Sequence, residues 1–333
     1  MRKLALAVLV ALTFLACDEM SMGVAYGDYN GIVAAMDPAL WDEVEDDVYV
    51  ALEPTMLTVR DEKTFTVTYQ DPTLPEWRNL RRFRQLLLVG TGDEVWMRDP
   101  IAHSERPIAG PGLYRVYDVW SRGQQITILV VEPGTAADGI RAHLAEINRT
   151  LDAQYREWAR DRMFMTGVDS ALADTLMALG RFQLLIPDVY RWSHEDSLYQ
   201  FRNDNPDPSE LIRNISVTWK SPIPADMHPE GILAWRAEVA AHYSEPQDVD
   251  LTVRDAGPFE FRGRPAYEIQ AIWKNPPDLN WPAAGPFVTR AVVCLEQQRT
   301  YLLDAWLYAP GKDKYEYMIQ LETILDSFRC GPA

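Results

Sequence analysis

Residues 288–328 read VTRAVVCLEQQRTYLLDAWLYAPGKDKYEYMIQLETILDSF, and this stretch predicts the fold class. Two runs rich in apolar and β-branched residues flank Gln297-Gln298, which predicts a β-hairpin. A helix is expected next, because apolar residues then recur at helical spacing: Met318, Leu321, Leu325 and Phe328. Paired strands followed by a helix that covers them are typical of an α+β fold.

The same order of elements occurs earlier in the chain. Residues 113–120 and 125–131 read as a hairpin across Arg122-Gly123. A long amphipathic helix follows, with one apolar stripe: Ile140, Leu144, Ile147, Leu151, Tyr155 and Trp158. We therefore predict an α+β protein of two similar halves, each an antiparallel sheet with helices packed on one face.

The start of the chain has the pattern of a secretory signal. Arg2 and Lys3 precede an apolar run that is shorter than the roughly 20 residues of a membrane span. The run ends Phe14-Leu15-Ala16-Cys17, which resembles the lipobox that lipoprotein signal peptidase reads. We predict cleavage after Ala16 and lipidation of Cys17. The alternative is a plain secretory signal with an incidental cysteine.

This signal predicts the location of the protein, and the length of the chain predicts its organisation. The lipid would anchor it to the inner or the outer membrane, outside the cytoplasm, so we expect a cell-envelope or periplasmic protein. The length of 333 residues suggests two domains or one large one. The predicted parts are a signal peptide (1–16), a lipid-anchored tether (17–28), an N-terminal α+β half (29–170) and a C-terminal α+β half (171–333).

The net charge limits the possible partners. A formal charge of −17 at pH 7 repels nucleic acid, so none is expected as a partner. Cys294 and Cys330 are an even pair in a compartment that permits disulfides, and a bridge would join the C-terminus to a strand. Two buried free thiols, or a redox or metal role, are the alternatives.

Several short motifs stand in an order that suggests a family. They are Asp118-Val119-Trp120, Gln124-Gln125, Leu185-Ile186-Pro187, Arg213-Asn214-Ile215, Gly285-Pro286-Phe287, Tyr308-Ala309-Pro310-Gly311-Lys312 and Leu321-Glu322. The chain resembles an uncharacterised family of bacterial lipoproteins, a domain of unknown function best known from Bacteroidetes. The resemblance implies a lipidated Cys17 and no known catalytic residue. At the level of the fold, each half also resembles the sheet-and-helix unit of PsbP-like proteins.

The sequence shows no recognisable reaction chemistry. The five histidines lack the spacing of a helical zinc site, and no nucleophile elbow or phosphate-binding loop occurs. Asp204-Asn205-Pro206-Asp207 lacks the Gly and the final Glu of a calcium loop. We therefore predict no catalytic residue, no metal site and no cofactor, and the sequence favours a protein without enzymatic activity while leaving that undecided.

Aromatic residues are the best candidates for binding. Trp273, Trp281 and Phe287 lie around a proline-rich loop, where exposed rings could bind a sugar or a protein. The alternative is that they pack in the core or the hairpin. The leading hypothesis is a lipid-anchored, non-catalytic binding or assembly module with an envelope protein or a glycan as partner. The alternative is a cell-wall or glycan-active enzyme with paired carboxylates.

Overall fold

The chain forms two compact units. A computed structural model describes residues 22–224, 227–279 and 281–332. The first unit comprises the described residues up to Pro54 together with Phe65–Thr150. The second comprises Thr55–Thr64 and the described residues from Leu151 onward. The chain passes between the units within helix α5 (Ala136–Met163), whereas the sequence pattern predicts a boundary after residue 170.

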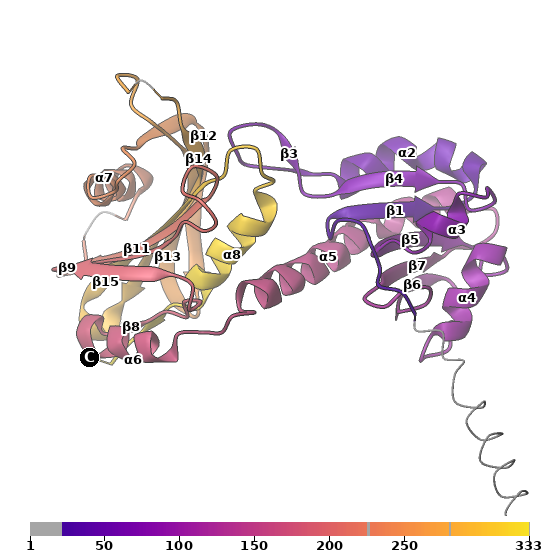
Figure 1. The fold of residues 1–333 in the computed structure, drawn as a ribbon, viewed down its shortest axis with the longest axis horizontal. Helices are drawn as coiled ribbons and strands as arrows, with labels where there is room; N and C mark the ends of the chain where they lie inside the picture. The colour runs from indigo at the N-terminus through magenta and orange to yellow at the C-terminus, as the bar shows by residue number, and fades with distance from the viewer. Residues whose placement is uncertain (1–21, 225–226, 280, 333) are drawn as a thin grey trace, which may run out of the picture. The chain divides into compact units, whose positions relative to one another are not determined.

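The first unit is built around a five-stranded sheet in the order β4-β1-β5-β7-β6 (Figure 1). Its strands are β1 (Gly31–Ala35), β4 (Thr66–Gln70), β5 (Gln85–Gly90), β6 (Gly112–Tyr117) and β7 (Gln125–Val130). β4, β1, β5 and β7 run parallel, and β6 is antiparallel to β7. The prediction of an antiparallel sheet in this half is therefore wrong, as is the prediction of two similar halves.

Strand composition explains this difference. β5 is buried at every position and reads as one continuous apolar run, QLLLVG. Such runs are typical of parallel strands that are covered on both faces. The β6–β7 hairpin forms as predicted, but the antiparallel pairing of this hairpin does not extend to the remaining strands.

Helices cover both faces of this first sheet. α3 (Trp77–Leu80) and α4 (Val95–His103) pack on the face that holds Val33 and Leu88. On the opposite face, α2 (Pro38–Leu52) lies beside the first part of α5, where Arg141 Nε donates to Asp47 at 2.6 Å (Figure 1). α2 buries the stripe that its spacing predicts: Trp41, Val44, Val48 and Leu52.

The second unit is built around a seven-stranded antiparallel sheet in the order β12-β13-β14-β15-β11-β10-β9. Its strands are β9 (Arg191–Glu195), β10 (Leu198–Asn203), β11 (Ile212–Lys220), β12 (Asp248–Phe261), β13 (Arg264–Lys274), β14 (Ala284–Cys294) and β15 (Arg299–Tyr308). All neighbouring strands are antiparallel. The mixed α+β fold and the antiparallel sheet of this half agree with the sequence analysis.

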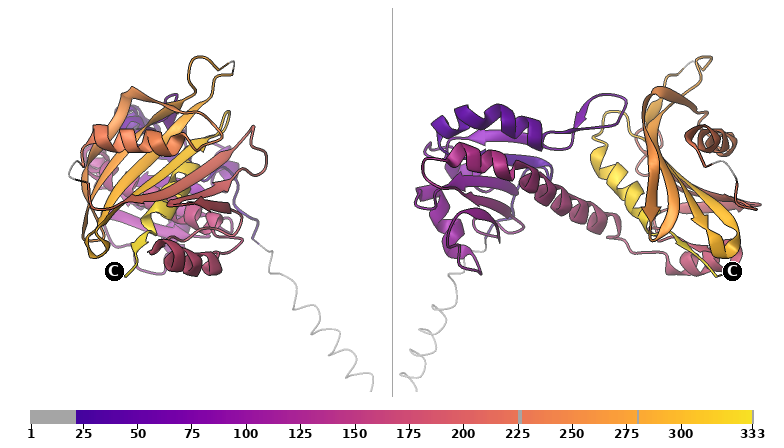
Figure 2. Two further views of the ribbon diagram at one scale, coloured as in Figure 1. Left: turned by 90° about the vertical axis from the view of Figure 1, so that its left-hand side faces the viewer. Right: turned by 180° about the vertical axis from the view of Figure 1, so that it is seen from behind.

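Helices also cover both faces of the second sheet, and the prediction of helices on one face is wrong. α6 (Ser170–Gly180) and α8 (Tyr315–Asp326) pack on one face, and α7 (Pro229–Ala240) packs on the other (Figure 2). β14 explains why, because Val288 and Val292 face α8 whereas Phe287 and Ala291 face α7. A strand that is apolar on both faces needs a cover on each.

Smaller elements complete the second unit. β2 (Thr55–Met56) pairs with β3 (Glu62–Lys63), and a 3-10 turn η1 (Leu295–Gln297) joins β14 to β15. Glu62 accepts from the backbone N–H of Tyr315 at 3.2 Å, which holds the Thr55–Thr64 segment at the start of α8.

A disulfide joins Cys294 at the end of β14 to Cys330 in β16 (Arg329–Cys330), with a Cα–Cα distance of 6.0 Å. β16 also pairs with β8 (Phe182–Gln183). The disulfide therefore ties the segment after α8 to the large sheet.

The predicted signal peptide and Cys17 lie outside the described residues. The predicted tether, residues 17–28, is described in part. Val24 and Tyr26 form bridges to Arg122 and Phe83, and Ala25 N–H donates to the Arg122 carbonyl at 2.9 Å. The chain from Val24 onward is therefore attached to the first unit. Within the described ranges, no helix combines the length and the apolar character that crossing a membrane requires.

Candidate functional site

The aromatic residues that the sequence suggested for binding do not form a surface. Trp273 and Phe287 are completely buried between the sheet and α7, whereas Trp281 is 50% exposed. Trp273 Nε1 donates to the Leu307 carbonyl at 3.1 Å. Gly285 makes room for this contact, because a Cβ there would lie 1.8 Å from the Leu307 oxygen. Core packing, the alternative that the sequence left open, therefore accounts for Trp273 and Phe287, and Trp281 is exposed.

The carboxylates of the acidic turn at residues 204–207 accept hydrogen bonds from the protein itself. Asp204 accepts from Arg191 Nη2 at 2.6 Å, and Asp207 accepts from the Ser209 hydroxyl at 2.6 Å. Among the residues that the structure describes, no group of three or more His, Cys, Asp or Glu side chains has the arrangement of a metal site.

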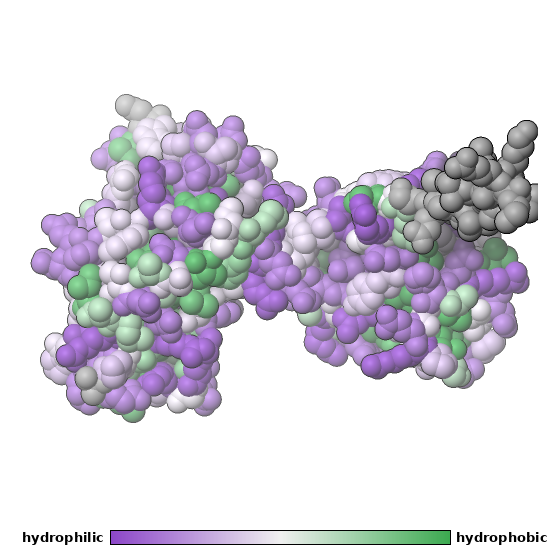
Figure 3. Space-filling model, turned by 60° about the horizontal axis from the view of Figure 1, so that its bottom comes forward, coloured by the Kyte–Doolittle hydropathy of each residue, from purple (hydrophilic) through white to green (hydrophobic). Residues whose placement is uncertain are grey.

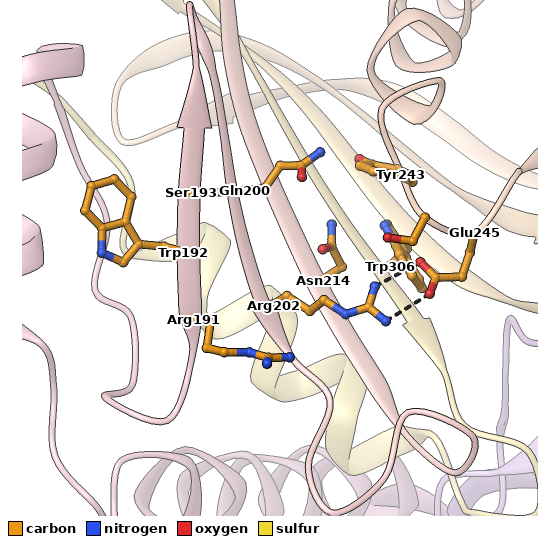
Figure 4. Close-up of a pocket in the computed structure, with 10 residues that line it drawn as sticks. Arg191, Trp192, Ser193, Gln200, Arg202, Asn214, Tyr243, Glu245 and Trp306 are labelled. Carbon is orange, nitrogen blue, oxygen red and sulfur yellow. Dashed lines mark hydrogen bonds and ion pairs between the residues drawn. The ribbon is translucent and has the colours of Figure 1, made fainter.

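A polar pocket lies elsewhere, on the α7 face of the second sheet (Figure 4). Its volume is about 240 Å³. Strands β9, β10, β11 and β15 supply one part of its wall, and the segment after α7 supplies the rest. The lining residues are Arg191, Trp192, Ser193, Gln200, Arg202, Asn214, Tyr243, Ser244, Glu245 and Trp306. We call this site the polar pocket.

Strand register brings these residues together. One row across four neighbouring strands consists of Arg191, Arg202, Asn214 and Trp306. The adjacent row consists of Ser193, Gln200, Ser216 and Asp304. Because alternate residues of a strand point to opposite faces, all eight side chains lie on the same face. β10 shows the pattern, since its buried Tyr199 and Phe201 face the other way.

The charges at the polar pocket are balanced. Arg202 donates to both carboxylate oxygens of Glu245 at 2.9 Å, shown as dashed lines in Figure 4, and its Nε donates to Asp204 at 3.2 Å. Arg191 bonds the same Asp204. Burial lowers the pKa of Arg202, but the hydrogen bonds and charges of Glu245 and Asp204 outweigh burial and raise it. Two guanidiniums thus face two carboxylates.

A buried network lies beneath the polar pocket. Tyr243 donates its hydroxyl to Asp304 Oδ2 at 2.6 Å, and Arg236 Nε donates to Asp304 Oδ1 at 2.8 Å. The Thr289 hydroxyl also donates to Asp304. Burial, and then the charge of Asp304, raises the pKa of Tyr243 well above its usual value. Tyr243 therefore keeps its proton and holds a fixed position at the edge of the polar pocket.

Trp306 is fixed in the same way. With the Asn214 amide oriented to satisfy its neighbours, Asn214 Oδ1 accepts from Trp306 Nε1 at 3.1 Å. Figure 4 shows Asn214 and Trp306 side by side at the base of the polar pocket, whereas Trp192 points away from it. The polar pocket therefore has a rigid base made of an indole and an amide, with the Tyr243 phenol at its edge.

The polar pocket offers binding groups rather than a proton-transfer pair. Its lining carboxylate, Glu245, and the neighbouring Asp204 both bond Arg202, so neither is free to donate or abstract a proton. Burial raises the pKa of Glu316 and Glu322, but these residues lie on α8 and pair with Arg162 and Arg156 of α5. They do not line the polar pocket.

Comparisons with known proteins agree with part of the resemblance seen in the sequence. The family model described as a domain of unknown function (DUF4837) matches residues 173–327, a range that contains every residue of the polar pocket. The match covers only this part of the chain and assigns no activity. No curated protein matches the chain.

The chain is also similar to solved structures. One is the solution structure of cyanobacterial PsbP from Synechocystis sp. PCC 6803, with 13% identity, 45% of this chain and 87% of that chain covered, and a TM-score of 0.30. The Ran-binding protein Mog1p of Saccharomyces cerevisiae has 9% identity, coverages of 45% and 90%, and a TM-score of 0.33. LpqN of Mycobacterium tuberculosis, involved in cell envelope biogenesis, has 14% identity, coverages of 45% and 83%, and a TM-score of 0.27. PsbP, the likeness expected from the sequence, is among them, and scores this low support no argument about function.

Sequence reasoning missed the residues of the polar pocket. Gln200 and Arg202 alternate with Tyr199 and Phe201, a pattern that indicates a polar face on this strand. No pattern indicated that Tyr243 and Glu245, about 40 residues later, would lie against that face.

Proposed function

We propose that this protein is a lipid-anchored, non-catalytic binding protein of the cell envelope, and that its second unit binds a saccharide in the polar pocket. The signal pattern that ends at Cys17 supports the anchor. The polar pocket supports the binding function. One observation carries the proposal. The planar polar side chains of Arg191 and Arg202, whose charges are balanced by carboxylates, lie in one row with Asn214 and Trp306, which form a rigid base.

Charge balance favours an uncharged ligand. Arg191 and Arg202 face Asp204 and Glu245, so the polar pocket has no net charge that would attract a charged ligand. A sugar hydroxyl can donate and accept at once, and it can bond a guanidinium, an amide or a carboxylate without separating them. Gln200, Ser193 and Ser244 supply further groups of this kind.

The size of the polar pocket sets the size of the bound group. Ligand pockets for drug-sized molecules have volumes of roughly 300–1,000 Å³. At about 240 Å³, the polar pocket fits one sugar residue or a group of similar size. We therefore expect recognition of a single residue, free or within a longer glycan.

The anchor is tested by metabolic labelling with radioactive palmitate. The full chain should incorporate label and fractionate with membranes, and Cys17→Ala should do neither. Label in the Cys17→Ala variant, or release of the unaltered protein from washed membranes, would contradict the anchor.

The binding function is tested by titration calorimetry with neutral monosaccharides and disaccharides that include N-acetylglucosamine. Gln200→Leu removes an amide from the polar pocket and should abolish the heat of binding. Gln270→Leu is the matched control, because Gln270 lies on β13, outside the polar pocket, and should bind normally. Equal binding by both variants would place the ligand elsewhere. Release of cleaved sugar during the titration would favour the enzyme instead.

A further inference from the structure

A second hollow in the second unit differs from the polar pocket, because its positive charges are not balanced by carboxylates. It has a volume of about 420 Å³ and shares no residue with the polar pocket. Its lining residues are Arg160, Phe164, Gln183, Leu185, Arg262, Thr323, Asp326, Ser327 and Arg329. We call it the basic hollow. Three arginines at one site stand out in a chain with a formal net charge of −17.

Two of these guanidiniums lack a carboxylate partner. Among the described residues, the Arg329 side chain has no hydrogen bond or ion pair, and it is exposed. Arg262 donates from Nε and Nη2 to the Asp326 carbonyl at 3.1 and 2.7 Å, which leaves its charge without an anion. The carboxylate of Asp326 is already bonded to Arg290 at 2.6 Å.

The third guanidinium is only weakly paired. Arg160 lies 3.9 Å from Glu157 and 3.5 Å from Asp161, and all three side chains are more than half exposed. Pairs of this kind contribute little in water. The basic hollow therefore carries positive charge that the protein itself does not neutralise.

Part of the wall between these arginines is apolar. Phe164 and Leu185 line the basic hollow, and Leu185 is 38% exposed. A smaller hollow of about 290 Å³ adjoins it, shares Arg262 and Arg329, and is lined by Phe261 and Phe328. The two arginines thus stand between two hollows with apolar walls.

Exposed apolar residues continue beyond the rim. Met165 is 78% exposed, and Val168 and Val189 are 40% and 38% exposed. Val168 forms a bridge to Pro187, which places the loop after α5 next to the loop after β8. Figure 3 shows separate hydrophobic residues among hydrophilic ones on the face of this unit that is turned to the viewer. Exposed apolar surface beside unpaired charge is typical of a binding site.

We infer that the basic hollow binds an amphiphilic anion, a carboxylate or phosphate with a hydrocarbon chain. Guanidiniums match the oxygens of both headgroups, and Arg329 and Arg262 have free donors for them. The hydrocarbon chain would lie along Phe164 and Leu185 and be removed from water there. A nucleotide or a sugar phosphate fits less well, because the Thr323 and Ser327 hydroxyls already donate to backbone carbonyls of α8 and Asp326 is bonded to Arg290.

The inference is tested with dodecanoate and dodecyl phosphate, each below its micellar concentration, by calorimetry on the full chain. Dodecanol and acetate are the comparison probes. Both dodecyl anions should bind, and dodecanol and acetate should bind far more weakly. Equal binding of dodecanol and dodecanoate would overturn the role of the arginines.

Variants locate the site. Arg329→Ala should weaken dodecanoate binding about tenfold or more, because a hydrogen bond to a charged group is lost. The fold should be unaffected, because Arg329 has no partner to lose among the described residues. Arg149→Ala removes an exposed arginine of α5 in the first unit and should bind normally. Normal binding by Arg329→Ala would overturn the inference.

Vesicles distinguish the source of the ligand, and they are offered to the Cys17→Ala form so that no lipid anchor contributes to binding. Binding of free dodecanoate, with or without binding to phosphatidylglycerol vesicles, supports a site for single amphiphiles. Binding to vesicles alone would overturn it in favour of membrane-surface attachment. Failure of saccharide binding leaves this result unaffected, because the two sites share no residue.

Discussion

Arg236 of α7 and Asp304 of β15 form an ion pair that is sealed from water. Their side chains are 0% and 1% exposed, and Nε lies 2.8 Å from Oδ1. Arg236 also lies 3.7 Å above the ring of Phe287 and donates from Nη2 to Gln247 at 2.7 Å. This pair holds α7 on the sheet and fixes Asp304, to which Tyr243 of the polar pocket is bonded.

Asp304→Ala should lower the free energy of unfolding by about 3–5 kcal/mol, because it leaves Arg236 buried without its partner. Urea titration measures the loss. The double variant Arg236→Met with Asp304→Leu should recover part of it, since both charges are then gone. Glu296→Ala, which breaks an exposed pair with Arg264, is the control and should cause no comparable loss. A double variant less stable than Asp304→Ala would contradict this account.

The disulfide closes a segment of 36 residues between Cys294 and Cys330. Its removal by Cys330→Ala should lower the stability by about 3–4 kcal/mol on the chain-entropy model. Thermal melts of the variant and of the reduced unaltered protein should agree. A reduced protein that melts at the same temperature as the oxidised one would show that the bond stabilises nothing.

Glu94 should make the first unit sensitive to acid. Burial raises its pKa, but the hydrogen bonds from Thr91 and Gly92 together outweigh burial and lower it. At 2.9 Å from Thr91 N and 3.0 Å from Gly92 N, the ionised carboxylate holds the loop after β5. A lowered folded-state pKa means that this stabilisation is present above the unfolded-state pKa and is lost as the pH falls through the folded-state pKa.

This dependence is measured by melting the protein between pH 3 and pH 7, beside Glu94→Gln. The variant should melt at a lower temperature at pH 7, and the difference should shrink on acidification. A difference that stays constant over the whole range would mean that the charge of Glu94 is not what holds the loop.

The two tryptophans of the proline-rich loop region should behave differently. Trp273→Ala should cost about 3–5 kcal/mol, because it empties a fully buried site. Trp281→Ala should cost far less, since Trp281 is half exposed, and it should leave saccharide binding in the polar pocket unchanged. Denaturant titrations and calorimetry check these two outcomes. Loss of binding in Trp281→Ala would return the loop to consideration as a binding site.

Local patterns in the sequence predicted individual elements well. The apolar stripe of α2 is buried as its spacing predicts, because helical spacing acts over a few residues. The long stripe of α5 is buried from Ile140 to Tyr155, whereas Trp158 is partly exposed. The β6–β7 hairpin and the one across Gln297-Gln298 form as well.

Long-range relationships could not be predicted in this way. The apolar run of β5 is compatible with parallel or antiparallel neighbours, so the doubly covered parallel sheet was missed. The polar pocket depends on the register that aligns Arg202 with Asn214 and Trp306, residues far apart in the chain. Trp273 and Phe287 looked like a loop cluster, yet their position within β13 and β14 buries them.

The central claim, that the polar pocket binds a saccharide, is tested most directly by nuclear magnetic resonance of the ¹⁵N-labelled protein during titration with N-acetylglucosamine and other neutral sugars. The indole N–H of Trp306 and the side-chain amides of Gln200 and Asn214 should shift together and saturate. The indole N–H of Trp273, which is bonded to the Leu307 carbonyl inside the core, should not move. Unchanged Trp306, Gln200 and Asn214 signals with every sugar would contradict the claim.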